Sequence, residues 1–196
     1  MAFWSESFAD KEGTFKDPKR QFRFTVEFQG LDAPQGGGTL WYAKSAAKPK
    51  FEITETEHRF LNHTFYYPSS LKWESVEIVM VDPVEPDVGA TLSDIVTQSG
   101  YAPPTDANSL STMSKAKAVG ALGTVLITQV DAEGNMVEAW TLWNAWIKSV
   151  DYGALAYDNE DLSEVTLTLM YDWARIETST PSVALAGGGG TEFFSV

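Results

Sequence analysis

The feature that most constrains the fold is an alternating segment near the carboxyl end of the chain, residues 164–173. Successive side chains of a β-strand point to opposite faces, so a period of two predicts a strand with one buried face. The apolar face carries Val165, Leu167, Leu169, Tyr171 and Trp173. The polar face carries Glu164, Thr166, Thr168 and Asp172, with Met170 as the exception. We therefore expect a half-buried strand, preceded by an acidic turn at 157–161 and a small-residue loop at Gly153.

Most other patterned segments also predict strands. Residues 20–29 alternate four apolar side chains with polar ones, as expected for a strand with one buried face. Further strands are expected over 39–45, 73–81, 122–130, 136–150 and 164–175, and the segment 46–73 is expected to hold two short strands joined by a long excursion. The aromatic content of 13% fits strands and interfaces better than helical bundles. The chain is therefore predicted to be mainly β.

One short helix is expected beside these strands. Leu92, Ile95 and Val96 recur at helical spacing within residues 90–99, and a helical turn is the most that 113–118 suggests. The predicted organisation is an N-terminal arm over 1–19, a β-domain over 20–177 with a long loop at 46–70 and an inserted loop at 101–120, and a flexible glycine-rich extension over 178–196.

The charge balance bounds the partners. The chain has 14 basic and 27 acidic residues, which give a formal net charge of −13. Duplex DNA is bound through Lys and Arg that displace counterions, so repulsion from nucleic acid is expected. There are no cysteines, which excludes disulfides and thiolate metal sites. The first residues lack the pattern of a signal peptide and no run of about 18 apolar residues occurs, so no membrane insertion is expected.

The residues that most often carry chemistry do not form a convincing site. The two histidines, His58 and His63, are five apart with no third metal ligand in the sequence nearby. Asp158, Glu160 and Asp161 lack the glycine and glutamate positions of an EF-hand loop. The run Gly187–Gly190 lacks the Lys and Ser or Thr of a phosphate-binding loop. We therefore expect no catalytic, cofactor-binding or metal-binding residues, and a protein that is not an enzyme.

Trp140, Trp143 and Trp146 are the most suggestive aromatic cluster. Such a strip could form a stacking platform for a sugar or for single-stranded nucleic acid. In one continuous strand, however, Trp143 would lie on the face opposite the other two. The negative charge also opposes nucleic acid. Packing in the core and against other subunits is the favoured interpretation.

Three blocks of the sequence, in order, resemble the tail tube proteins of contractile-tailed bacteriophages. The first is the strand with Phe22–Phe28, which follows a charged arm. The second runs from Tyr42 to Pro83 and combines a strand, an Ala/Lys-rich passage, a long excursion and a Trp-centred strand that ends in Val-Asp-Pro. The third runs from Trp140 to Trp173. Tubes of type VI secretion systems and tailocins share this fold.

The resemblance implies a β-sandwich or small barrel with one short flanking helix. Subunits of this family close into hexameric rings with a continuous lumenal β-barrel, and the rings stack into a hollow tube. The implied partners are copies of the same chain, together with sheath, baseplate and terminator proteins, while viral DNA passes without specific binding. The implied location is the virion tail, assembled in the host cytoplasm, and no cofactor is implied.

The resemblance also suggests which residues meet other copies. The excursion would be an arm that reaches the adjacent ring, with contact residues Phe51, Ile53, Phe60, Phe65 and Tyr66. The candidate lumenal face is the polar face of the carboxyl-terminal strand, with Glu164, Thr166, Thr168 and Asp172. An acidic wall would offer passing DNA no counterion-release gain. The acidity could alternatively serve solubility alone.

Three other functions are weighed against the phage tube. The tube of a contractile injection or secretion system would use the same ring and pass protein cargo. A carbohydrate-binding β-sandwich would use exposed Trp rings and would form no ordered oligomer. A small hydrolase that uses carboxylates is the weakest alternative, because no nucleophile motif or metal cluster occurs.

Overall fold

A computed structural model describes residues 18–30, 43–85, 87–103, 112–158 and 160–179. Four parts of the prediction lie outside these residues. They are residues 1–17 of the arm predicted over 1–19, most of the strand expected at 39–45, residues 104–111 of the inserted loop, and residues 180–196 of the extension with its four glycines. The described part contains ten strands and two helices, so the prediction of a mainly β protein is confirmed.

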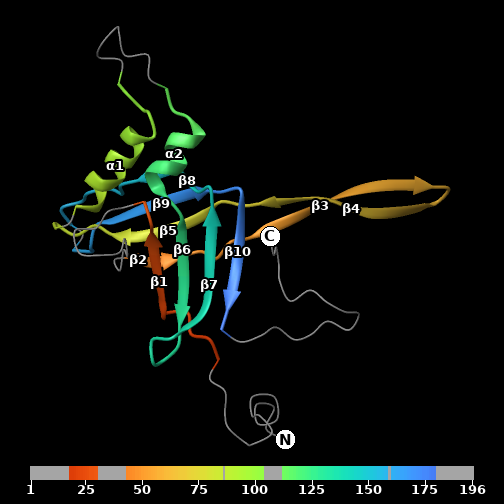
Figure 1. The fold of residues 1–196 in the computed structure, drawn as a ribbon, viewed down its shortest axis with the longest axis horizontal. Helices are drawn as coiled ribbons and strands as arrows, with labels where there is room; N and C mark the ends of the chain where they lie inside the picture. The colour runs from red at the N-terminus through yellow and green to blue at the C-terminus, as the bar shows by residue number, and fades with distance from the viewer. Residues whose placement is uncertain (1–17, 31–42, 86, 104–111, 159, 180–196) are drawn as a thin grey trace, which may run out of the picture.

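Two four-stranded antiparallel sheets form the body of the protein (Figure 1). The first sheet has the order β1-β6-β7-β10, with strands Phe24–Phe28, Val125–Val130, Met136–Trp143 and Trp173–Thr178. The second sheet has the order β2-β5-β9-β8, with strands Ala43–Ala46, Val76–Val81, Glu164–Met170 and Trp146–Asp151. The strands of the two sheets run across one another in the view of Figure 1. Neither sheet closes on itself, so the body is a sandwich and not a barrel.

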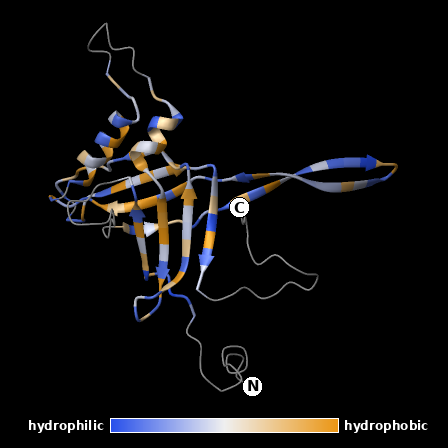
Figure 2. Cartoon of the chain, in the orientation of Figure 1, coloured by the Kyte–Doolittle hydropathy of each residue, from blue (hydrophilic) through white to orange (hydrophobic). Residues whose placement is uncertain are grey.

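The core lies between the two sheets. The alternating segment 164–173 supplies Val165, Leu167 and Leu169, which are fully buried. Their neighbours across β5 are Val76, Ile78 and Met80, also fully buried. The first sheet contributes Val26, Phe28, Val125, Ile127, Leu142 and Ala174. Figure 2 shows the resulting alternation of hydrophobic and hydrophilic residues along β6, β7 and β10.

Two helices, and not the one predicted, lie against the sandwich. Helix α1 spans Val88–Gln98. Its N-cap is Asp87, whose carboxylate accepts a hydrogen bond from the amide of Ala90 at 2.8 Å. Helix α2 spans Lys115–Leu122, and its N-cap is Ser114. The sequence predicted only a helical turn at 113–118, because the many small residues of this segment give little apolar periodicity. Its small residues Ala118 and Ala121 are nevertheless buried, so close packing on the body supports this helix.

Helix α2 ends at a close backbone contact. Gly123 has a φ of 71°, a conformation that favours glycine. A Cβ on Gly123 would lie 2.2 Å from the amide nitrogen of Gly30, which follows β1. The two glycines therefore let the chain turn from α2 into β6 directly against the end of β1. Leu122, predicted to open the strand, is the last residue of the helix.

The segment 46–73 forms a long β-hairpin instead of an excursion between two short strands. Strand β3 spans Phe51–Phe60 and β4 spans His63–Trp73, and they pair only with each other among the described strands. The hairpin extends away from the body (Figure 1). At about 3.4 Å per residue, ten residues give it a length of about 34 Å.

Two long strands predicted from the sequence are each divided in the structure. The predicted strand 136–150 breaks after Trp143, at Asn144 with a φ of 55°, and its two parts enter different sheets. The predicted strand 164–175 breaks at residues 171 and 172, and β10 joins the other sheet. The alternation also shifts at this break: Ala174 is buried, whereas Trp173 is 41% exposed. A periodicity of two cannot show where a chain crosses between sheets.

Candidate assembly surfaces

The second sheet has two open edges. Among the described residues, β2 hydrogen-bonds only to β5, and β8 only to β9. Edge strands carry unpaired N–H and C=O groups that can pair with another chain. The strands alternate in direction across the sheet, so β2 and β8 run antiparallel to each other. If β8 of one copy lay beside β2 of the next, the antiparallel pattern would continue.

The outer face of this sheet, here called the threonine face, points away from the core. The register places on it Glu77, Val79, Val81, Trp146, Ser149, Asp151, Glu164, Thr166, Thr168 and Met170. Three of the four residues expected on a lumenal face, Glu164, Thr166 and Thr168, therefore lie together and are partly exposed. The fourth, Asp172, lies outside β9, in the break before β10.

Asp172 belongs to a polar contact at the corner between the two sheets. Its carboxylate accepts hydrogen bonds from Lys115 at 2.6 Å and 2.7 Å and from the Asn144 side chain at 2.8 Å. The hydrogen bond from Lys115 holds the pKa of Asp172 below its ordinary value. Asp172 thus joins the start of α2 to both chain crossings, at Asn144 and after β9.

The charged groups of the threonine face are mostly carboxylates. Glu77 and Asp151 lie on it, and Glu164 pairs with Lys44. The hydrogen bond to Glu164 raises the pKa of Lys44. Lys148 is exposed and falls in a β-bulge of β8, where the register does not assign it to either face. Hydroxyl and carboxylate groups therefore dominate this surface.

The hairpin is fixed to the body by a row of aromatic rings at its base. The Phe51 and Trp73 rings meet edge to face with centroids 5.3 Å apart, and the Trp73 and Tyr171 rings lie 5.8 Å apart. Trp73 is 8% exposed and Tyr171 4% exposed, and burial raises the pKa of Tyr171 to about 12. The amide of Glu74 also donates a hydrogen bond to the carbonyl of Lys50 at 2.9 Å.

Beyond the base, the apolar side chains of the hairpin change faces. Ile53 pairs with Leu71 near the base, on the face that Phe51 and Trp73 also occupy. A β-bulge follows, where Thr54 contacts Ser70 through its hydroxyl group. Past this bulge the aromatic residues Phe60, Phe65 and Tyr67 lie on the opposite face. Tyr66 pairs with Glu57 and lies on the same face as Phe51 and Ile53.

The five residues predicted for an inter-ring arm are thus all on the hairpin and all exposed, but they form two groups. Phe51 and Ile53 are 45% and 53% exposed at the base, while Phe60, Phe65 and Tyr66 are 62%, 43% and 59% exposed nearer the tip. Exposed apolar side chains that lie next to one another are typical of surfaces that meet a partner. The face change at the bulge presents Phe60 and Phe65 in the direction opposite to Phe51 and Ile53, while Tyr66 stays on the face of Phe51 and Ile53.

Both histidines lie at the hairpin tip. His58 pairs with Phe65 and His63 with Phe60, so the turn places both imidazoles on one face. The His63 and Phe65 rings meet edge to face at 4.8 Å. Their spacing in the sequence does not show this arrangement, because it depends on the position of the turn. The described part of the chain contains no group of three or more potential metal ligands.

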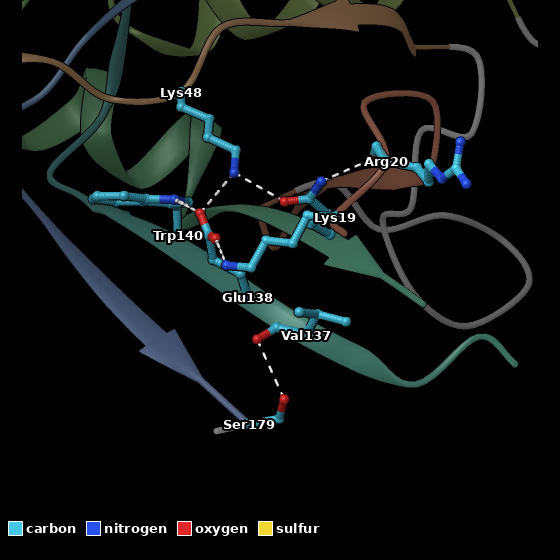
Figure 3. A network of polar contacts seen from close by, with 8 residues as sticks. Lys19, Arg20, Lys48, Val137, Glu138, Trp140 and Ser179 are labelled. Carbon is cyan, nitrogen blue, oxygen red and sulfur yellow. Dashed lines mark hydrogen bonds and ion pairs between the residues drawn. The ribbon is translucent and has the colours of Figure 1, made fainter. Parts of the chain in front are cut away.

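Glu138 forms a buried polar cluster that ties three segments together (Figure 3). Its carboxylate pairs with Lys48, at 2.7 Å, and with Lys19, and it accepts a hydrogen bond from the Trp140 indole at 2.6 Å. Lys48 also donates to the Gln129 side chain at 2.9 Å, and Gln129 donates to the carbonyl of Arg20 at 2.7 Å. The cluster therefore connects the first described residues, the segment that leads into the hairpin, and the first sheet.

The electrostatics of this cluster favour the charged form of Glu138. Burial alone would raise its pKa, but the hydrogen bonds from Lys19, Lys48 and Trp140 outweigh burial and lower the pKa to about 2. The Glu138 side chain is 7% exposed, whereas both lysines are about half exposed. Sequence analysis did not select Glu138. The one sequence feature that could have indicated it is its place in the strand, because Glu138 falls on the same face as Trp140 and Leu142.

The three tryptophans of the predicted strip separate in the structure. Trp140 lies in the Glu138 cluster, and Trp146 lies on β8 in the other sheet. Trp143 stacks with Trp173, with centroids 6.0 Å apart and an interplanar angle of 16°. Both rings of this pair are about 40% exposed. The chain crossing at Asn144 thus prevents a continuous three-ring platform.

Several solved structures are similar to this chain in fold. No protein-family model matches the sequence, and no curated protein matches it either. Among solved structures, a chain in the cryo-EM structure of the anti-feeding prophage baseplate, 6-fold symmetrised, is similar over 84% of this chain and 98% of its own, with a TM-score of 0.60 and 16% identity. The chain has a phage tail tube-like fold.

Two further solved structures support the tail tube-like fold. A chain in the sheath-tube complex of PVC, an extracellular contractile injection system, matches 82% of this chain and 92% of its own, with a TM-score of 0.59 and 15% identity. A chain from the tube terminating cap of the anti-feeding prophage matches 91% of this chain and 100% of its own, with a TM-score of 0.59 and 18% identity. No helix in the described ranges is long and apolar enough to cross a membrane.

Proposed function

We propose that this chain is a structural, non-enzymatic subunit that assembles into rings and forms the tube of a contractile tail-like machine. The observation that carries the proposal is the second sheet, which combines two open edges of compatible direction with a partly exposed polar face. Pairing β8 with β2 of the next copy satisfies both edges, and the edges disappear only when the ring closes.

Six copies per ring fit this arrangement. The similar anti-feeding prophage baseplate was 6-fold symmetrised, and six four-stranded sheets make a barrel of twenty-four strands. At a spacing of about 4.8 Å between strands, such a barrel has a radius of at least about 18 Å. Barrels of about 16–18 strands already leave an aqueous channel, so this ring leaves an open lumen.

The threonine face would line this lumen. Its hydroxyl groups and the carboxylates of Glu77, Asp151 and Glu164 are accessible to solvent within the sheet. A duplex that passes such a wall gains little from counterion release, so it does not adhere. Over the Debye length of about 8 Å at physiological salt, the wall repels it. The proposed cargo of a phage tube is therefore viral DNA, which passes without specific binding.

Protein cargo is the second candidate. The similar chains with the higher TM-scores come from the anti-feeding prophage and from PVC, an extracellular contractile injection system. A weakly acidic wall rich in hydroxyl groups also suits the passage of a folded acidic protein. A DNA conduit would place the subunit in the virion tail, assembled in the host cytoplasm, and an injection system would place it in a phage-like particle.

The proposed partners follow from the same arrangement. Copies of this chain meet through the sheet edges and through the hairpin, whose exposed residues Phe51, Ile53, Phe60, Phe65 and Tyr66 are the proposed contacts with the adjacent ring. Sheath, baseplate and terminator proteins are the proposed partners at the outside and at the ends, because the similar chains occur in sheath-tube, baseplate and cap structures.

Sedimentation and mass measurement of the purified chain test the proposal. We expect closed rings of six subunits at high concentration, with further stacking into tubes. A variant with Ser149→Pro should reduce ring formation, because proline removes a backbone donor from the edge strand β8. A wild-type chain that stays monomeric at high concentration would overturn the proposal.

A further inference from the structure

The end of the body opposite the hairpin carries an exposed apolar and acidic surface. It is formed by residues 152–158 and 160–163, in the connection from β8 to β9. Leu155 is 95% exposed and Leu162 72% exposed, and Tyr157 is fully exposed. A groove of about 570 Å³ lies among them, lined by Lys44, Gly153, Ala154, Leu155, Ala156, Asp161, Leu162, Ser163 and Glu164. We call this surface the loop groove.

The loop groove is strongly acidic. Residues 151–164 contain five carboxylates, which are Asp151, Asp158, Glu160, Asp161 and Glu164, and no Lys or Arg. The nearest cation is Lys44, which pairs with Glu164 at one wall of the groove. Excess negative charge and exposed aliphatic and aromatic side chains therefore occur together. Solubility alone would account for the charge, but not for the apolar side chains.

The hairpin tip has the complementary composition. Residues 58–70 contain one charged residue, Arg59, together with His58 and His63. The tip also exposes Phe60 at 62% and Leu61 at 81%. Leu61 has a φ of 54°, in a region where glycine is usual, at the first position of the two-residue turn. A large apolar residue is thus held in an unfavourable backbone conformation at the most exposed point of the hairpin.

The register places these two surfaces at opposite ends of the second sheet. The hairpin leaves from the end of the sheet marked by Val76 and Trp146, since β4 ends three residues before β5 begins. The loop groove lies at the other end, marked by Val81, Asp151 and Glu164. In Figure 1 the hairpin extends to the right of the body, and the opposite strand ends lie on the left.

We propose that the hairpin tip of one copy docks in the loop groove of a second copy in the adjacent ring. This inference rests on the proposed function and specifies how the rings of the tube attach to each other. Phe60, Leu61 and Phe65 would cover the exposed Leu155, Tyr157 and Leu162. The two histidines, on the face of Phe60, and Arg59, on the opposite face, would meet carboxylates on the two sides of the tip. A contact between different surfaces at opposite ends of one molecule does not close on itself, so it propagates along an axis.

The charges make this contact selective for one arrangement. Copies with a net charge of −13 repel each other, and two loop grooves would bring like charges together. The remaining charged groups near the tip are Glu55 and Glu57, which lie on the face of Arg59, opposite the histidines. The tip is the part of the hairpin in which basic groups outnumber acidic ones, so it is the end that an acidic groove attracts.

Charge reversal tests the pairing. Arg59→Glu in the tip and Glu160→Arg in the loop groove should each shorten the stacks at least several-fold, and the two changes together should restore much of the wild-type length. Lys72→Glu is the matched control, because it makes the same change in charge at the hairpin base and should leave stack length nearly unchanged. Length distributions from negative-stain electron microscopy at one ionic strength provide the measurement.

A second variant separates the apolar contribution from the charge. Leu61→Gly suits the positive φ of the turn, so it should fold normally and still shorten the stacks. Stacks of normal length in all single variants would overturn the inference. So would a double variant whose stacks are no longer than those of the shorter single variant. In either case, intact rings would leave the proposed function standing. A wild-type chain that forms no rings would instead overturn the proposed function, and this inference with it.

Discussion

At the scale of single residues, Glu138 holds together segments that are far apart in the sequence. Its carboxylate meets Lys19, Lys48 and Trp140, so it fixes the entry to the hairpin against the first sheet. Both lysines are about half exposed, so solvent weakens each pair. The contribution of the cluster should therefore be smaller than the value expected for fully buried ion pairs.

We expect Glu138→Gln to lower the free energy of unfolding by about 2 kcal/mol at pH 7, because the neutral amide loses the charge-assisted bonds to both lysines. Urea denaturation, carried out at a protein concentration at which the chain is monomeric, provides the measurement. Glu133→Gln is the control, since Glu133 is exposed in the turn between β6 and β7. Equal stability of the two variants would contradict a structural role for the cluster.

The lowered pKa of Glu138 also predicts a pH dependence. The carboxyl titrates near 4.5 without its partners and at about 2 in the folded chain. The stabilisation is therefore complete above about pH 4.5 and is lost as the pH falls toward 2. The stability difference between the wild type and Glu138→Gln should shrink over this interval. If the stability difference stayed constant from pH 5 to pH 2.5, the lysines and Trp140 would not stabilise the ionised form of Glu138.

A pair of glycine substitutions tests the close contact after α2. Gly123→Ala should destabilise the fold by at least about 2 kcal/mol, since it combines a positive φ with a Cβ placed against the backbone of Gly30. Gly120→Ala, in the same helix, meets no atom within 4 Å and should stabilise the helix by about 0.5–1 kcal/mol. Thermal unfolding of the two variants gives the comparison, and changes of the same sign would contradict this explanation.

At the scale of elements, the sequence predicts what depends on local pattern. The alternation in β1, β5 and β9 and the apolar spacing in α1 all correspond to observed elements. What the pattern does not encode is the partner of each strand. The breaks at Asn144 and at residues 171–172 move the chain from one sheet to the other, so single predicted strands become β7 and β8, and β9 and β10. Helix α2 depends on packing of small residues, which periodicity does not detect.

The hairpin is the element with the least support from the body. All residues of β3 are exposed, and a two-stranded ribbon is marginally stable in water when it stands alone. We therefore expect amides of residues 53–70 to exchange with solvent much faster than those of β5 and β9 in the unassembled chain. Hydrogen exchange measured before and after assembly should show the hairpin gaining protection. Strong protection in the monomer would contradict this expectation.

At the scale of the whole molecule, the two outer faces and the two ends of the sandwich have different properties. The threonine face is polar, the outer face of the first sheet carries the stacked Trp143 and Trp173, and the hairpin and the loop groove occupy opposite ends of the second sheet. The sequence predicted the polar residues Glu164, Thr166 and Thr168 and the hairpin's aromatic residues. It could not predict the relation between these surfaces, because that relation comes from strand order.

The measurement that tests the central claim most directly is a cryo-EM reconstruction of the particles formed by the purified chain. The account predicts a ring in which β8 of each subunit lies antiparallel beside β2 of its neighbour, with Glu164, Thr166 and Thr168 facing the lumen. A ring whose lumen is lined by the first sheet, or one in which β2 and β8 remain unpaired, would contradict it.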